Sequence, residues 1–134
     1  MDGKTNKVSV VLRITGSASD IAMLASCLTL FEGRMEQRPF NVPTAALPDA
    51  WWAFEVTQQN QESTEVAIAE ALDMLEPMEA AILNVANDPR FQIELDCSIE
   101  IEEERPVMEV SAHTLRRLAR LNATLGFEVY DYRE

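Results

Sequence analysis

Acidic side chains at regular spacing are the part of this sequence with the clearest chemical potential. Residues 91–102 alternate apolar and polar types, and four of the polar positions are the carboxylates Glu94, Asp96, Glu100 and Glu102. If this segment is a β-strand, residues two apart project from one face with their Cα atoms about 7 Å apart. Carboxylates at that spacing could act as an acid–base pair in glycoside hydrolysis, hold a calcium ion or attract a cationic protein.

The pattern favours docking over the other two kinds of chemistry. An acid–base pair needs surroundings that separate the two pKa values, usually an apolar cleft, and a strip of polar residues on an open strand face provides none. No glycine-punctuated ligand loop for calcium accompanies these acids. We therefore expect no catalytic residue, no metal site and no cofactor. Partner binding is assigned to Glu94, Asp96, Glu100, Glu102, Glu103, Glu104 and Trp51. The alternative that stays open is a solvated sheet face whose only benefit is solubility.

The few histidine and cysteine residues argue against two further kinds of site. His113 is the only histidine, so a zinc site of several Cys and His ligands cannot be assembled from one chain. It follows Ser111 at an expected helix start, where an exposed imidazole needs no functional explanation. Cys27 and Cys97 each lie within an apolar pattern, and we expect two buried thiols rather than a disulfide.

The net charge narrows the choice of partners. The 134 residues carry 23 acidic and 11 basic side chains, which gives a formal net charge of −12. The excess comes from residues 54–104, which hold fourteen acids and one base, whereas the rest of the chain is nearly neutral. Nucleic acids and anionic membranes would be repelled by such a protein. The expected partner is therefore a cationic protein.

The expected compartment and domain organisation follow from the length and from what the sequence lacks. No apolar run approaches the roughly 20 residues that span a bilayer, and residues 1–7 lack the apolar core of a signal peptide. A chain of 134 residues has the size of one ordinary domain. We expect a cytoplasmic protein with a single domain over residues 1–134 and an ordered core over about residues 7–132.

The elements that would hold these residues follow an α+β pattern. Period-two alternation predicts strands at 8–15, 51–57, 91–102 and 127–132, with a brief further strand near 107–109. Helical spacing predicts helices at 18–31, at 63–87 with a kink or a division into two shorter helices at Pro77, and from Ser111 to about 121. The order β-α-β-α-β-(β)-α-β predicts a mainly antiparallel sheet of four or five strands, with helices packed on one face and the other face free.

Three further segments could contribute to a site. Residues 33–50 contain three prolines and no sustained periodicity, so we expect a long connection, and connections of this length are often functional. Trp51 and Trp52 point to opposite sides of the next strand, one into the core and one toward solvent or the 33–50 connection. The last helix presents Arg116, Arg117 and Arg120, which we expect to be solvated or paired with Glu109 rather than to bind phosphate.

Three segments, taken in order, resemble a known bacterial family. They are the strand VVLRITG at 10–16, the tryptophan-bearing strand WAFE at 52–55, and the closing helix at 115–121 followed by GFEVY at 126–130. Together they resemble the bacterial domain of unknown function 4279, and the resemblance spans residues 8–132. The chain departs from the family before the tryptophan, where family members carry a glycine and charged residues and this chain carries Arg34, Arg38 and three prolines.

The resemblance brings no established enzyme activity with it. Similar small acidic domains often accompany bacterial toxins as immunity proteins. The resemblance and the charge together therefore predict a non-enzymatic, cytoplasmic immunity protein that binds a cationic, secreted toxin domain. The rival expectation is a small-molecule binding or regulatory domain with a pocket in the 33–54 region, between the proline-rich connection and the aromatic strand that follows it.

Overall fold

Five strands and five helical segments succeed one another along the residues that the computed structural model describes, which are 6–28, 34–37, 50–59 and 62–133. The strands are β1 (Lys7–Gly16), β2 (Arg34–Gln37), β3 (Ala50–Gln59), β4 (Gln92–Ile101) and β5 (Ala123–Asp131). The helical segments are α1 (Ala18–Cys27), α2 (Thr64–Leu75), the 3₁₀ turn η1 (Glu76–Met78), α3 (Glu79–Val85) and α4 (Ala112–Arg120). The predicted α+β class is confirmed.

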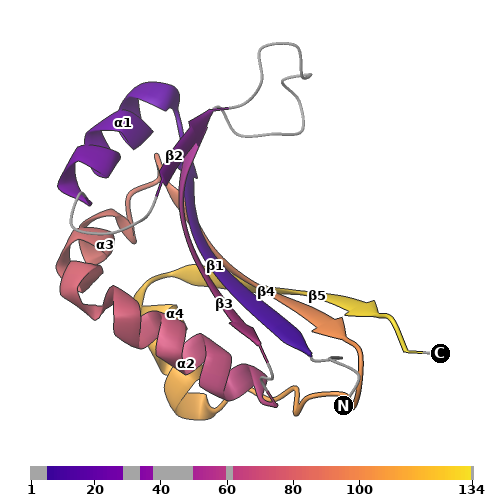
Figure 1. Ribbon diagram of the computed structural model, residues 1–134. Helices are drawn as coiled ribbons and strands as arrows, with labels where there is room; N and C mark the ends of the chain where they lie inside the picture. The colour runs from indigo at the N-terminus through magenta and orange to yellow at the C-terminus, as the bar shows by residue number, and fades with distance from the viewer. Residues whose placement is uncertain (1–5, 29–33, 38–49, 60–61, 134) are drawn as a thin grey trace.

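The five strands form one sheet in the order β2-β3-β1-β4-β5 (Figure 1). β1 pairs antiparallel with β3 and β4, and β2 pairs antiparallel with β3. Among the described strands only β4 and β5 run parallel, because α4 carries the chain back along the sheet between them. The predicted mainly antiparallel sheet is confirmed, with one parallel pair at its edge.

The described helices all cover the same face of this sheet (Figure 1). The strand residues beneath them are buried: Val8, Val10, Leu12, Ile14, Trp52, Phe54, Ile93, Leu95, Cys97, Ile99 and Ile101. Helix residues that pack on them include Ile21, Leu24, Ile68, Leu72, Ile82 and Leu118. The opposite side of the sheet is covered by none of the described helices and is termed the open face. It carries the odd-numbered residues of β1 and β3 and the even-numbered residues of β4 and β5.

Local sequence signals set the helix boundaries. Ser17, Ser63 and Ser111 each accept a hydrogen bond at the side-chain oxygen from the backbone N–H three residues later, which satisfies one free donor of the first turn. Pro77 lies in η1, where the chain passes from α2 to α3. Residues 63–87 therefore form two shorter helices divided at Pro77, which is one of the two predicted arrangements. None of the described helices has the length and apolar character needed to cross a membrane.

The expected strand near 107–109 is wrong. Val107 forms an isolated bridge to Ser63, because its N–H donates to the carbonyl of Glu62 and its own carbonyl accepts from the N–H of Thr64. Its backbone groups are thus used at the start of α2 and do not extend the sheet.

Three other boundaries differ from the expectation. Residues 34–37 form β2 inside the expected connection, and four residues are too few for a period to be recognised. β5 begins at Ala123 rather than at residue 127, because Asn122 adopts a φ of 54° and turns the chain directly from α4 into register with β4. α1 ends at Cys27, and residues 29–31 of the expected helix lie outside the described residues.

Candidate partner-binding surface

The predicted acidic strip lies on the open face. Glu94, Asp96 and Glu100 project from β4 on the side away from the helices and are partly exposed. The sheet order places β1 on one side of them and β5 on the other. The side chains of those two strands therefore decide how acidic the strip is.

Two cations on β1 lie among these acids. Arg13 stands opposite Glu94 in the register, and its Nη1 lies 3.0 Å from Asp96 Oδ2 and 4.0 Å from Glu94 Oε2. Lys7 stands opposite Glu100, with its Nζ 3.5 Å from Glu100 Oε2. Ion pairs as exposed as these contribute at most about 1 kcal/mol each to stability. The strip is thus partly neutralised by its neighbours rather than being a bare row of like charges.

Asp96 also reaches over β5. Gly126 stands opposite Asp96, and a Cβ at this position would lie 2.6 Å from Asp96 Oδ1. A side chain there would therefore push the carboxylate aside. With glycine, one oxygen of Asp96 is bound by Arg13 and the other lies above the outermost strand.

The other three predicted acids lie in the turn after β4. Glu102, Glu103 and Glu104 are exposed. Asn6 holds this turn: its Oδ1 accepts from the N–H of Glu102 at 2.9 Å and of Glu103 at 3.2 Å, and its Nδ2 donates to the carbonyl of Glu104. Three exposed carboxylates therefore follow directly after the end of β4.

Trp51 and Trp52 lie on opposite sides of β3, as predicted. Trp52 is in the core with 2% of its surface exposed, and Trp51 is half-buried on the open face. Trp51 stands opposite Thr15 of β1, which stands opposite Gln92. The structure therefore places Trp51 across β1 from the Glu94 end of the strip and not beside the acidic turn.

Several open-face residues were not singled out from the sequence. Glu55 on β3 and Glu128 on β5 widen the acidic surface. Tyr130 and Tyr132 lie at the exposed end of β5 with their rings stacked and 6.5 Å between centroids. The Tyr130 hydroxyl donates to Glu128 at 2.8 Å, and this hydrogen bond and the carboxylate charge raise the pKa of Tyr130. Alternation within β5 puts Glu128 and Tyr130 on one side, but only the register with β4 shows which side that is.

The charges of the strands on the open face sum to an excess of acid. On β1, β3, β4 and β5, five carboxylates, Glu55, Glu94, Asp96, Glu100 and Glu128, accompany two cations, Lys7 and Arg13. Glu94 and Asp96 share one cation and one exposed face, so their surroundings lack the contrast that an acid–base pair needs. What this arrangement can do is attract and orient cationic groups.

Two arginines of α4 form ion pairs with acids of the helix layer, on the side of the sheet opposite the open face. Arg117 Nη2 lies 2.9 Å from Asp73 Oδ1, and Arg120 Nη1 lies 2.8 Å from Glu79 Oε1. Both arginines are therefore paired, but with partners on α2 and α3 that the sequence did not indicate. Pairing with Glu109 is wrong, because α4 packs beside α2 and turns these side chains toward it.

The expectation for the cysteines is half right. Both are free thiols, and Cys97 is buried in β4, where burial raises its pKa to about 11. Cys27 is exposed rather than buried, because it is the last residue of α1 and lies on the flank of that helix.

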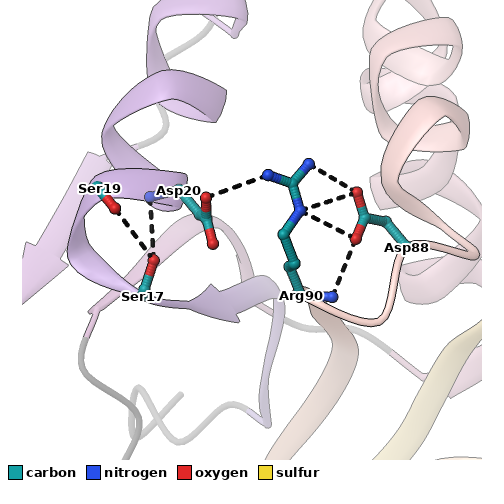
Figure 2. Close-up of polar contacts among 5 residues, drawn as sticks. All are labelled: Ser17, Ser19, Asp20, Asp88 and Arg90. Carbon is teal, nitrogen blue, oxygen red and sulfur yellow. Dashed lines mark hydrogen bonds and ion pairs between the residues drawn. The ribbon is translucent and has the colours of Figure 1, made fainter.

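A second candidate site is an apolar pocket between α1 and α3, with a volume of about 190 Å³. Its apolar lining comes from Met23, Leu24, Cys27, Ala81, Val85 and Phe91. Figure 2 shows the polar network beside it: Arg90 lies between Asp20 of α1, at 3.3 Å, and Asp88, at 2.8 Å. Most of the 33–54 region, where a pocket was expected, lies outside the described residues.

The fold and this surface define a class of protein, an α+β domain whose described helices leave one acidic sheet face uncovered. Residues 38–132 match the model of the family described as "Domain of unknown function (DUF4279)", and the chain belongs to that family. The match includes the tryptophan-bearing strand, the closing helix and the closing strand on which the resemblance rested, and it begins after β1. No curated protein and no solved structure matches the chain.

Proposed function

We propose that this chain is a non-enzymatic protein that binds a cationic protein through the open face of its sheet. We further propose that the partner is a bacterial toxin, which the chain neutralises as an immunity protein. The observation that supports binding is the uncovered face itself, where four strands present five carboxylates with two cations. Such a face attracts cationic surfaces and speeds their association.

The net charge of −12 supports a partner of opposite sign. Acidic inhibitors of basic nucleases gain fast association from complementary fields, and their association rates fall steeply with salt. An immunity protein with this role would act in the cytoplasm, on a toxin domain that has reached its target compartment.

The gene beside this one supplies the probe for the test. If it encodes a large secreted protein with a variable C-terminal domain, that domain is expressed in a bacterial host with and without this chain. The chain should restore growth, and the purified pair should associate at least about tenfold more slowly at about 300 mM salt than at about 50 mM. Neighbouring genes of metabolism alone, or a toxin domain that the chain neither binds nor neutralises, would contradict the proposal.

Matched charge variants locate the binding face. The open-face variant combines Glu94→Gln, Asp96→Asn, Glu100→Gln and Glu102→Gln. The helix-layer control combines Glu70→Gln, Asp73→Asn, Glu76→Gln and Glu79→Gln, which removes the same charge and likewise breaks ion pairs. Near physiological salt, affinity should fall at least about tenfold in the first variant and less than about threefold in the second.

The outcome of this comparison separates the alternatives. Equal loss in both variants would mean that the long-range field alone acts, and no loss in either would mean that the acidic excess serves solubility. Both variants should remain folded, since each ion pair that they break is worth at most about 1 kcal/mol and the unpaired positions are exposed, where a substitution usually changes stability by less than about 0.5 kcal/mol.

The pocket between α1 and α3 supports the rival function, small-molecule binding. It is mainly apolar with a few polar groups at its margin, which is the usual character of such sites. Thermal shift against a metabolite library tests it. Specific stabilisation by one compound, abolished by Cys27→Trp at the pocket wall and accompanied by no protein partner, would replace the toxin proposal.

A further inference from the structure

The outer edge of β5 carries neither a proline nor a bulge, and its two charges, Glu128 and Asp131, are acidic and would not repel a basic strand. β5 is the last strand of the sheet, and no described strand pairs with its outer side (Figure 1). Proteins usually protect long edges with proline, a bulge or charges, because the unpaired N–H and C=O groups accept another strand. β5 contains no proline, and its register with β4 runs without a skip from Ala123 to Asp131. The backbone of β5 is therefore able to receive a further strand.

One hydrogen bond shows which residues of β5 face outward. The N–H of Tyr132 donates to the carbonyl of Ile101 at 2.8 Å. Backbone groups of successive residues in a strand point to opposite sides, so Glu128 and Tyr130 direct theirs toward β4, as Tyr132 does. Phe127 and Val129 direct their N–H and C=O groups to the free edge.

The side chains of these outward-facing residues are apolar and exposed. On the helix side of β5, Ala123 and Leu125 pack against the core. Phe127 and Val129 follow them along the strand, and each keeps 44% of its surface exposed. Apolar side chains beside an added strand would be covered by it, which would remove them from water.

Carboxylates line the other side of the same edge. Asp96 lies above Gly126, Glu128 projects from β5 itself, and Glu100 stands opposite Tyr130. Two successive open-face positions of an added strand would thus lie beside the carboxylates of Asp96 and Glu128, and the next would lie beside Tyr130. Tyr130 and Tyr132, which are stacked and exposed, lie at the last of these positions, and exposed aromatic rings can contact a cation.

We infer that the cationic partner adds an extended segment to the free edge of β5, and that this segment alternates basic and apolar side chains. The basic side chains lie on the open face beside Asp96 and Glu128, and the apolar ones lie beside Phe127 and Val129. This inference rests on the proposed function and specifies how the partner is held, by strand addition with side chains selected in alternation. A second copy that paired through its own β5 does not fit, because that strand carries Glu128 and Asp131 and no basic residue.

A designed peptide tests the edge directly. The probe is a capped, fluorescently labelled peptide of about seven residues that alternates lysine and valine. A peptide with glutamate in place of lysine should bind at least about tenfold more weakly, because the open face is acidic. Two further peptides carry N-methyl groups on the valines only or on the lysines only. Strand addition uses one set of N–H groups, so one methylated peptide should lose at least about tenfold in affinity and the other should not.

Variants of β5 give the matching test on the protein. Val129→Pro removes an outward N–H without removing a hydrogen bond to β4, and proline is tolerated at such edge positions. It should weaken binding of the lysine–valine peptide at least about tenfold, whereas the control Val129→Ile should stay within about twofold. Val129→Lys keeps the backbone intact and adds a charge that repels the peptide. It should also weaken peptide binding, and it tests the edge even if the proline variant does not fold.

Three results would overturn the inference. The first is equal binding by both N-methylated peptides, and the second is unchanged binding by folded Val129→Pro and by Val129→Lys. The third is a dimer of this chain that Val129→Pro dissociates, because a second copy would then occupy the edge.

The two proposals fail in distinguishable ways when the toxin domain itself is the ligand. If the open-face charge variant weakens binding and Val129→Pro does not, the docking surface stands and strand addition is wrong. If Val129→Pro weakens binding and the charge variant does not, selection by charge is wrong. If neither variant weakens binding, both proposals are wrong.

Discussion

Replacing Arg13 by glutamine tests the charge arrangement of the open face without any partner. Arg13→Gln removes a side chain that is 34% exposed and lies 3.0 Å from Asp96 and 4.0 Å from Glu94. Each partly exposed ion pair is worth about 0.2–1 kcal/mol, and the two acids left behind repel each other. We therefore expect the free energy of unfolding to fall by about 0.5–2 kcal/mol, which lowers Tm by about 2–8 °C in a domain of this size.

Urea unfolding at low and high salt provides the assay. The loss should shrink between about 20 mM and about 500 mM salt, because screening weakens partly exposed charge pairs. Arg116→Gln is the matched control: it gives the same net charge, and Arg116 is exposed on α4 and belongs to none of the ion pairs found among the described residues. The reasoning is refuted if Arg13→Gln costs no more than Arg116→Gln at low salt, or if its cost is the same at both salt concentrations.

Two further predictions concern protonation and thiol chemistry. Burial raises the pKa of Glu65, but hydrogen bonds from the Ser111 N–H and the Thr114 hydroxyl, each 2.6 Å, outweigh burial and hold the pKa below its ordinary 4.5. Glu65→Gln should therefore lower Tm at pH values above 4.5, and the difference from the wild type should shrink as the pH falls through the lowered pKa; a difference that stays constant contradicts this. In the folded protein Cys27 should react readily with a thiol reagent, whereas Cys97, with a pKa of about 11, should react only after unfolding, and equal rates would show that the burial of Cys97 is wrong.

The sequence predicted best those elements whose two sides differ in environment. The alternation of residues 91–102 matches β4 (Gln92–Ile101) to within a residue at each end, because one side of this strand meets the helices and the other meets water. The same alternation placed Glu94, Asp96 and Glu100 together on one face. A strand with one side in the core and the other in solvent alternates apolar and polar residues, and this alternation can be recognised within a short stretch of sequence.

Contacts that depend on register could not be predicted in the same way. Arg13 reaches Asp96 only because β1 lies between β3 and β4 in one particular alignment, and residue types along either strand do not encode that alignment. The exposed edge of β5 has the same origin. Phe127 and Val129 continue an apolar alternation that predicts burial, but the crossover through α4 leaves this strand outermost and its far half beyond the helix layer.

At physiological salt the acidic excess of residues 54–104 does not act as one field, because the fold divides it between two layers. Asp73 and Glu79 face the arginines of α4, whereas Glu94, Asp96 and Glu100 face the cations of β1. Packed layers lie about 10 Å apart, and the Debye length is about 8 Å at physiological salt but about 30 Å at 0.01 M. A cation on the open face is thus screened from the helix-layer acids at physiological salt but not at about 0.01 M. The open-face and helix-layer charge variants should therefore slow association with a cationic partner equally at about 0.01 M salt and differ at about 0.15 M. If the two variants slow association equally at about 0.15 M as well, total charge attracts the partner and the open face has no special role.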